Sequence, residues 1–157
     1  MRIGLISDTH GLLRPEAIEA LKGCDLILHT GDIGNPNILE ELRLLAPLEV
    51  VRGNNDYPDA WPEIPDSNYL EIEGWTILMV HDKSHAPGYL AQRPADLVIF
   101  GHSHRPADFE WEGARYINPG AAGKKRFSLP ISVAILELEV GSASLKFVNL
   151  LDERVLP

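Results

Sequence analysis

At residues 97–104 the chain reads Leu97-Val98-Ile99-Phe100-Gly101-His102-Ser103-His104. Its first four residues form a short, unbroken apolar run, which is typical of a strand buried on both faces. Two histidines one residue apart follow the expected end of this strand. Neutral imidazole is the commonest protein ligand for transition metals, and two imidazoles placed this way can point at neighbouring points in space. Taken alone, such a pair is also typical of an ordinary polar loop.

The same order, an apolar run followed by polar side chains, recurs along the chain. Residues 3–6, 26–28 and 48–51 have the composition of buried strands, and residues 68–73 and 75–80 predict a hairpin around Gly74. Taken singly, the polar groups that follow could cap helices or form turns. In chain order these groups are Asp8, His10, Asp32, Asn54, His81, His102 and His104.

Helical signals lie between the first three strands. Pro15 with an acidic neighbour begins one segment, and Asn35-Pro36 begins another. Alternating strands and helices predict an α/β fold with parallel neighbouring strands. The second half is expected to be richer in strands and to form one domain, 1–157, with the first. Its expected elements are a turn at 86–88, a short helix at 89–92, strands at 107–110 and 115–117, and an antiparallel pair at 131–138 and 144–150.

Composition excludes several classes of protein. The formal net charge of −9 argues against a dedicated nucleic-acid surface, which needs positive charge, and the one basic run, Lys124-Lys125-Arg126, is interpreted as a solvated loop. No apolar run is long enough to span a bilayer, so we expect no membrane partner. The early charge at Asp8 argues against a signal peptide, so we expect a cytoplasmic protein. Cys24 is the only cysteine, which excludes an internal disulfide and a thiolate metal site.

The position of the polar groups predicts a metal site. In open α/β sheets, ligands bind beyond the carboxyl ends of the strands, so groups far apart in sequence can converge at one edge. Seven oxygen and imidazole donors are enough for two cations that share one carboxylate, at the separation of roughly 3.5–4 Å that is usual for paired metals.

Five short motifs together resemble the calcineurin-like metallophosphoesterases. They are Asp-Thr-His at 8–10, Gly-Asp at 31–32, Gly-Asn-Asn-Asp at 53–56, His81, and Gly-His-Ser-His at 101–104. They occur in the family's order over nearly the whole chain, whose compact length is similar to the small bacterial and archaeal phosphodiesterase branch. The resemblance implies a four-layer αββα sandwich, with two mixed β-sheets flanked by helices and a binuclear metal site at one end.

The resemblance also implies a role for each of these residues. Asp8, His10, Asp32 and His104 would hold the first ion, Asp32 would bridge, and Asn54, His81 and His102 would complete the second. Such ligands fit two divalent transition-metal ions, with manganese expected first and iron, nickel, cobalt or zinc as alternatives. The implied reaction is hydrolysis of phosphodiesters by in-line attack of a metal-bridging hydroxide, with Asp32, Asn54 and Asp56 as catalytic residues.

Two positions depart from the family pattern. Asn55 stands where a histidine is common, and an amide has no proton to give to a leaving group at neutral pH. Water or His85 could supply that proton instead, and His85 could equally be a plain surface residue. Asp82 stands where a glycine commonly follows the motif histidine, which leaves the shape of that loop open.

Several functions and partners stay open at this point. The first hypothesis is a phosphodiesterase acting on a small phosphodiester or nucleotide-like substrate. The alternatives are a phosphomonoesterase, including a protein phosphatase, and a protein-interaction scaffold like the retromer-subunit branch of the same fold. The oligomeric state stays open between a monomer and a homo-oligomer. His29 is interpreted as a core histidine, Trp75 and Trp111 as packing residues, and Asn118-Pro119-Gly120 as a structural turn.

Overall fold

The first sheet carries the N-terminal strand at its centre. In this computed structural model, which describes residues 1–151, its strand order is β10-β9-β1-β2-β3. Strands β1, β2 and β3 are parallel, and β9 runs antiparallel to β1. The strands are β1 (Arg2–Ile6), β2 (Leu26–His29), β3 (Leu48–Val50), β9 (Ser132–Glu139) and β10 (Ser142–Asn149). The predicted parallel strands and the predicted C-terminal antiparallel pair are therefore confirmed in one sheet.

The second sheet is also mixed, with the order β4-β5-β6-β8-β7. The predicted hairpin forms its edge, because β4 pairs antiparallel with β5 around Gly74, while β5, β6 and β8 are parallel. The strands are β4 (Ser67–Ile72), β5 (Trp75–Val80), β6 (Leu97–Ile99), β7 (Ala107–Trp111) and β8 (Ala114–Asn118).

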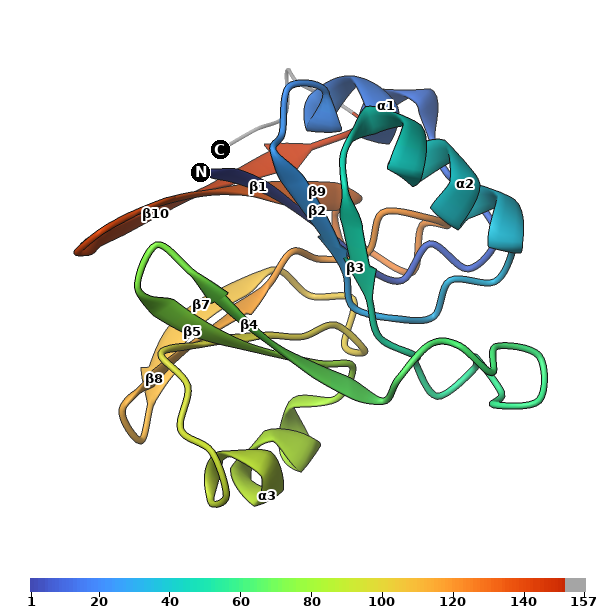
Figure 1. Ribbon diagram of the computed structural model, residues 1–157. Coiled ribbons are helices and arrows are strands. Elements are labelled where there is room, and N and C mark those ends of the chain that lie inside the picture. Colours follow the sequence, from blue (N-terminus) through green and yellow to red (C-terminus); the bar gives the residue numbers. More distant parts are fainter. Residues whose placement is uncertain (152–157) are drawn as a thin grey trace.

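The two sheets lie face to face, with helices on the outer faces (Figure 1). Helices α1 (Pro15–Leu21) and α2 (Pro36–Leu45) cover the first sheet, and α3 (Ala86–Leu90) lies outside the second. Apolar side chains fill all three spaces between the layers: for example Ile27 with Leu42 under the helices, Leu5 with Ile99 between the sheets, and Leu78 with Ala86 under α3. The four-layer sandwich is confirmed. No helix among residues 1–151 has the length and apolar character needed to cross a membrane.

The short helix after β5 was predicted in the wrong place. Instead of a turn at 86–88 and a helix at 89–92, a 3-10 turn (Lys83–His85) leads directly into α3, Ala86–Leu90. Asp82 begins this segment, because its carboxylate accepts a hydrogen bond from the Ser84 N–H at 2.9 Å. Pro87 then fits the first turn of α3, where a missing N–H has no cost. The cap at Asp82 therefore sets where the helical segment begins, and Pro87-Gly88 lie inside α3 and form no separate turn.

His29 is a core histidine, as predicted. It is fully buried at the end of β2. Its Nδ1 accepts from the Gly31 N–H at 3.1 Å, so Nε2 carries the hydrogen and donates to Thr9 Oγ1 at 3.0 Å. Burial lowers the pKa of His29 to about 4. Both ring nitrogens are thus satisfied in the neutral form, and protonation would break the bond from Gly31.

We expect His29 to weaken the fold in mild acid. Its folded-state pKa lies below the unfolded value of 6.5, so only the unfolded chain takes up this proton as the pH falls from 6.5 toward 4. The free energy of unfolding should fall by about 3 kcal/mol over that range. Urea unfolding of the wild type and of His29→Gln, both with chelator, would isolate this term as the difference between their pH slopes. His85→Gln, at an exposed site, is the control; an unchanged slope in His29→Gln would contradict the assignment.

Candidate metal centre

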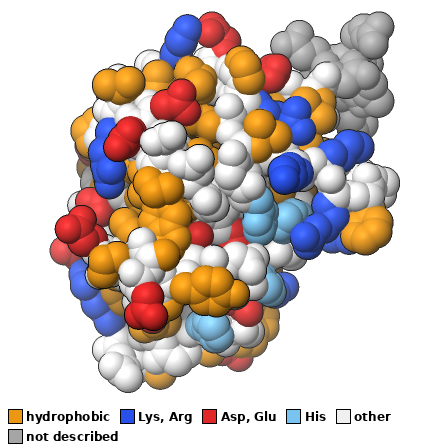
Figure 2. Space-filling model, turned by 90° about the vertical axis from the view of Figure 1, so that its right-hand side faces the viewer, with side chains coloured by type: hydrophobic (Ala, Val, Ile, Leu, Met, Phe, Trp, Pro, Cys, Tyr) orange, Lys and Arg blue, Asp and Glu red, His pale blue; other side chains and the backbone are white. Residues whose placement is uncertain are grey.

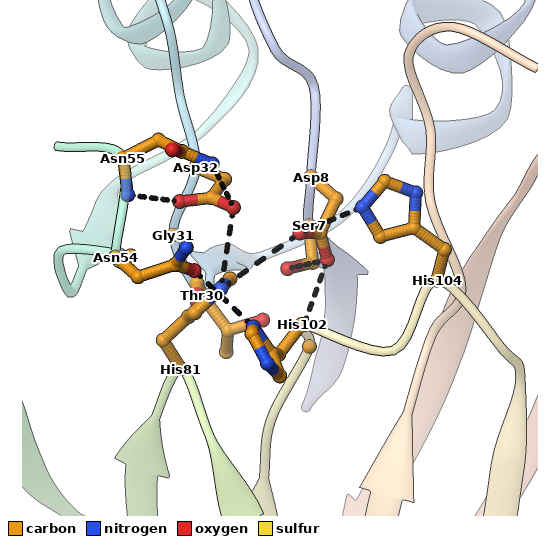
Figure 3. Close-up of polar contacts among 12 residues, drawn as sticks. Ser7, Asp8, Thr30, Gly31, Asp32, Asn54, Asn55, His81, His102 and His104 are labelled. Atoms are coloured by element: carbon orange, nitrogen blue, oxygen red, sulfur yellow. Dashed lines mark hydrogen bonds and ion pairs between the residues drawn. The ribbon is translucent and has the colours of Figure 1, made fainter. Parts of the chain in front are cut away.

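The strand ends of the two sheets bring the predicted ligands together. Asp8 and His10 follow β1, Asp32 follows β2 and Asn54 follows β3, all from the first sheet. His81 follows β5, and His102 and His104 follow β6, from the second sheet. Figure 3 shows the carboxylates of Asp8 and Asp32 facing the histidines that approach from the other sheet.

Five of these residues form two triads that could each hold a metal ion. Asp8, His10 and His104 make one, and Asp8, Asp32 and His81 make the other. Asp8 Oδ1 lies 3.4 Å from His104 Nε2, 3.7 Å from His10 Nε2 and 3.9 Å from His81 Nε2. The family resemblance implies Asp32 as the bridging ligand, whereas Asp8 is the residue common to both triads here. Asp32 Oδ2 is also central, at 3.5 Å from His10 Nε2 and 3.4 Å from His81 Nε2.

Asn54 and His102 lie beside the second triad. Asn54 Oδ1 is 3.2 Å from His102 Nδ1, and the rings of His102 and His81 are 5.2 Å apart, edge to face. All seven predicted ligands therefore belong to one cluster. Asn54 and His102 are exposed, while Asp8, Asp32, His81 and His104 are buried. The cluster is open to solvent on the Asn54–His102 side.

Buried atoms in this cluster fit a cation. Among the described residues, Asp8 Oδ1 and His81 Nε2 are buried and make no hydrogen bond. Leaving such groups unpaired costs about 1–3 kcal/mol each. His10 Nε2 and His104 Nε2 face one another at 3.3 Å, so at least one presents a lone pair. Lone pairs on oxygen and imidazole nitrogen that point at a shared space are the donor set that borderline transition metals bind.

The ionisation states of the two carboxylates in the cluster suit the binding of cations. Burial alone would raise the pKa of Asp8, but the imidazoles of His10, His104 and His81 outweigh it and hold the pKa well below its usual range. Burial likewise opposes ionisation of Asp32, and His81 with the Asn55 N–H lowers its pKa. Both carboxylates are therefore ionised at neutral pH. Burial lowers the pKa of His81, but Asp32 and Asp8 raise it overall, so protons compete with a metal there.

The backbone at the ligands is unusual. Asp8, His10, Asp32, His102 and His104 all have positive φ, between 45° and 72°. For residues other than glycine this left-handed conformation costs about 1–2 kcal/mol each. Such conformations cluster at functional sites, where the surroundings hold them. The strand exits thus turn these side chains into the cluster at a conformational cost.

Two residues that the sequence analysis did not assign to the site support the ligand loops. Ser7 Oγ donates to Asp8 Oδ2 at 2.9 Å, beside the bond that the same oxygen accepts from the His102 N–H at 3.1 Å. Asn118, predicted as part of a structural turn, donates from Nδ2 to the Gly101 carbonyl at 3.0 Å. Gly101 has no room for a side chain, because a Cβ would overlap Ser7 Oγ. The serine directly before Asp8 was the one available signal for this contact.

Asn55 donates two hydrogen bonds to the carboxylate of Asp32. Its backbone N–H donates to Asp32 Oδ1 at 2.9 Å, and its Nδ2 donates to Asp32 Oδ2 at 3.1 Å. The amide at the position where the family commonly has histidine is thus engaged with a predicted metal ligand. His85, the alternative proton donor, lines a cavity of about 360 Å³ together with Asn54, His81 and His102. Asp82, the second departure, also lines it, with Oδ2 3.9 Å from His102 Nε2.

Asp56 joins the two loops that carry Asp32 and Asn54. Its buried carboxylate accepts from the Ile33 N–H at 3.0 and 3.2 Å and from the Gly53 N–H at 2.9 Å. These contacts are to the backbone, so the carboxylate orients its neighbours. These contacts are those of a positioning residue, and the catalytic role expected from the motif stays a prediction.

We expect Asp56→Ala to destabilise the protein by about 2–4 kcal/mol. The substitution leaves the buried N–H groups of Ile33 and Gly53 without their acceptor, at about 1–3 kcal/mol each. Urea unfolding measures the change, and Asp59→Ala, an exposed position in the same loop, is the matched control. Equal stability of the two variants would contradict this role of Asp56.

Comparison with known proteins matches the chain to one domain family. The calcineurin-like phosphoesterase superfamily domain matches residues 1–141. A probable metallophosphoesterase of Methanothermobacter thermautotrophicus is 39% identical over 151 residues, covering 88% of this chain and 87% of that protein.

Solved structures share the fold. An archaeal phosphodiesterase aligns with a TM-score of 0.76 at 26% identity, covering 94% of this chain and 100% of that one. Wild-type Vps29 of Entamoeba histolytica, complexed with zinc, aligns with a TM-score of 0.76 at 22% identity, covering 96% and 99%, a likeness of fold alone. With the domain match over residues 1–141 and the 39% identical relative, the chain belongs to the calcineurin-like phosphoesterase superfamily.

Proposed function

We propose that this protein is a phosphodiesterase that binds two divalent transition-metal ions at the cluster around Asp8. The observation that carries the proposal is the pair of triads that share Asp8. The similarity to an archaeal phosphodiesterase over nearly the whole chain supports the diester class. We propose manganese as the native metal, with iron, nickel, cobalt and zinc also compatible with these ligands.

Each group of ligands would have a defined task. Asp8, His10 and His104 would hold one ion, and Asp32, His81, Asn54 and His102 the other, with Asp8 and Asp32 between them. When bound, divalent cations supply Lewis acidity, which lowers the pKa of water and offsets charge on phosphate oxygens. Asn55 keeps Asp32 oriented by its two hydrogen bonds.

The cavity beside Asn54 and His102 would receive the ester. Its volume of about 360 Å³ suits a small substrate, and its opening adjoins the exposed side of the cluster. The Asn54 amide can donate to a phosphate oxygen there. His85 lines the same cavity, so a leaving group lying in it could reach an imidazole.

Metal content and a substrate panel test the proposal together. We expect two ions per chain by elemental analysis, with two anomalous-scattering peaks at the cluster. Phosphodiesters should be cleaved faster than phosphomonoesters, with cyclic nucleotides as a third class. One ion per chain under metal excess would contradict the binuclear site. Faster monoester cleavage would indicate a phosphomonoesterase, and two bound ions without turnover would indicate the scaffold alternative.

A further inference from the structure

A short basic loop, residues 124–127, borders the metal cluster. Lys124, Lys125 and Arg126 are consecutive and exposed, in a chain whose net charge is −9. The loop lies between β8 and β9. Figure 2 shows Lys and Arg side chains gathered along one side of the histidines on the face that carries the cluster. Local charge at this edge is therefore opposite to the charge of the whole protein.

The root of this loop is fixed beside the predicted ligands. The Ala122 N–H donates to the Ser7 carbonyl at 3.0 Å, and Arg14 Nε donates to the Gly123 carbonyl at 2.9 Å. Gly123 packs so closely on Thr9 that a Cβ would overlap the Thr9 carbonyl. The basic residues thus begin directly after a point anchored between Asp8 and His10.

The basic side chains of the loop are available for an anion. Within residues 1–151, the ion pairs of Arg52, Arg93 and Arg115 each use a carboxylate. None of the ion pairs in this described part of the chain involves Lys124, Lys125 or Arg126. Lys125 Nζ donates to the Leu129 carbonyl at 3.3 Å, so within residues 1–151 the three positive charges have no carboxylate partner.

Phe127 adds an aromatic surface to the loop. Its side chain is 88% exposed, and its φ is +54°. A left-handed backbone at a bulky residue is uncommon and costs free energy. An exposed aromatic ring beside basic residues is the combination that binds nucleotides, because bases stack on the ring while phosphates meet the charges.

We propose that residues 124–127 recognise a nucleotide part of the substrate, with Phe127 stacking on the base and Lys124, Lys125 and Arg126 binding a second phosphate next to the scissile ester. This inference rests on the proposed phosphodiesterase function and names its substrate class. Three basic residues suit a nucleotide or the end of a strand and are too few for a duplex-binding surface, consistent with the acidic composition.

Three substrates with one leaving group test the proposal. Bis(p-nitrophenyl) phosphate lacks a nucleoside, thymidine 5′-(p-nitrophenyl phosphate) adds a base, and its 3′-phosphate derivative adds a second phosphate. Because p-nitrophenolate leaves in each case, the leaving group is constant, and the loop variants below separate recognition from the intrinsic reactivity of each diester. We expect kcat/KM to rise about tenfold with the base and about tenfold again with the phosphate at low salt, with the second gain decreasing as salt is added.

Two loop variants test which side chains produce each of the two gains in kcat/KM. Phe127→Ala should remove the gain from the base, and the triple variant Lys124→Ala, Lys125→Ala, Arg126→Ala should remove the gain from the phosphate. Both should leave bis(p-nitrophenyl) phosphate within about twofold of the wild type. Lys22→Ala, Arg43→Ala, Lys146→Ala is the matched control, since it removes three exposed positive charges from α1's end, α2 and β10. This control variant should retain both gains in kcat/KM.

Amide chemical shifts give a readout independent of turnover. Thymidine 3′,5′-bisphosphate, added to the zinc-loaded protein, should shift the amides of residues 124–127. Equal kcat/KM of the wild type on all three substrates would overturn the proposal. So would a loss of kcat/KM in the loop variants that is the same on all three substrates. Either result would leave the proposed phosphodiesterase function intact. No cleavage of any diester by the wild type would instead overturn the proposed function.

Discussion

Asp8→Asn is expected to lower kcat/KM on aryl phosphodiesters by about 10³-fold or more and to reduce the metal content below one ion per chain. Asp8 Oδ1 is the oxygen that faces His10, His81 and His104 together, and it belongs to both triads. In the variant the amide oxygen can keep the bonds from Ser7 and the His102 N–H. The amide NH2 then takes the place of Oδ1 and presents a donor where a cation needs an acceptor.

Asp32→Asn tests the second carboxylate of the cluster in the same way. Asp32 should also be essential, with turnover nearly abolished and the fold intact, because an amide cannot supply the charge of a carboxylate between the imidazoles of His10 and His81. Asp59→Asn is the surface control. Circular dichroism and thermal unfolding establish that each variant is folded. Wild-type turnover and two bound ions in either variant at the cluster would remove that residue from the site.

The second large effect concerns the leaving group. Asn55 cannot give a proton, and its side chain is bound to Asp32. We therefore expect a strong preference for diesters with acidic alcohols, such as aryl esters, over alkyl esters. General acid assistance is worth roughly 10²–10⁴-fold where it is needed, so alkyl diesters should be slower by a factor in that range. A plot of log kcat against the leaving group's pKa measures the dependence, once chemistry is shown to limit the rate.

Two variants locate the proton donor. Asn55→His should raise turnover of alkyl diesters more than of aryl diesters, and the ratio of the two gains cancels changes in folding or metal content. His85→Ala is the matched comparison, since His85 lines the same cavity. Rates independent of leaving-group pKa in the wild type, and dependent on it in His85→Ala, would identify His85 as the acid and contradict the expected preference.

The gathering of the seven candidate ligands was predictable from the sequence, because strand ends and donor types are local properties. Asp8, Asp32 and His81 each follow an apolar run, and parallel strands place such ends at one edge. The sharing of Asp8 was not predictable, since it depends on side-chain direction at positive φ. The contact of Asn55 with Asp32 and the close packing of Gly123, at the root of the basic loop, on Thr9 depend on tertiary packing between segments far apart in sequence. Helix α3 begins earlier than predicted, because the cap at Asp82 outweighs the turn tendency of Pro87-Gly88.

The origin of the ligands in both sheets has a consequence for how the chain folds. Residues 8–54 supply four candidate donors and residues 81–104 supply three, so neither part could bind the proposed ions tightly before the sheets have packed across Leu5, Met79 and Ile99. Cations held there would act as a cross-link formed last. They should slow unfolding without accelerating folding, since interactions absent from the transition state affect mainly the unfolding rate. Metal retention in the presence of a chelator would then measure kinetic persistence of the native state.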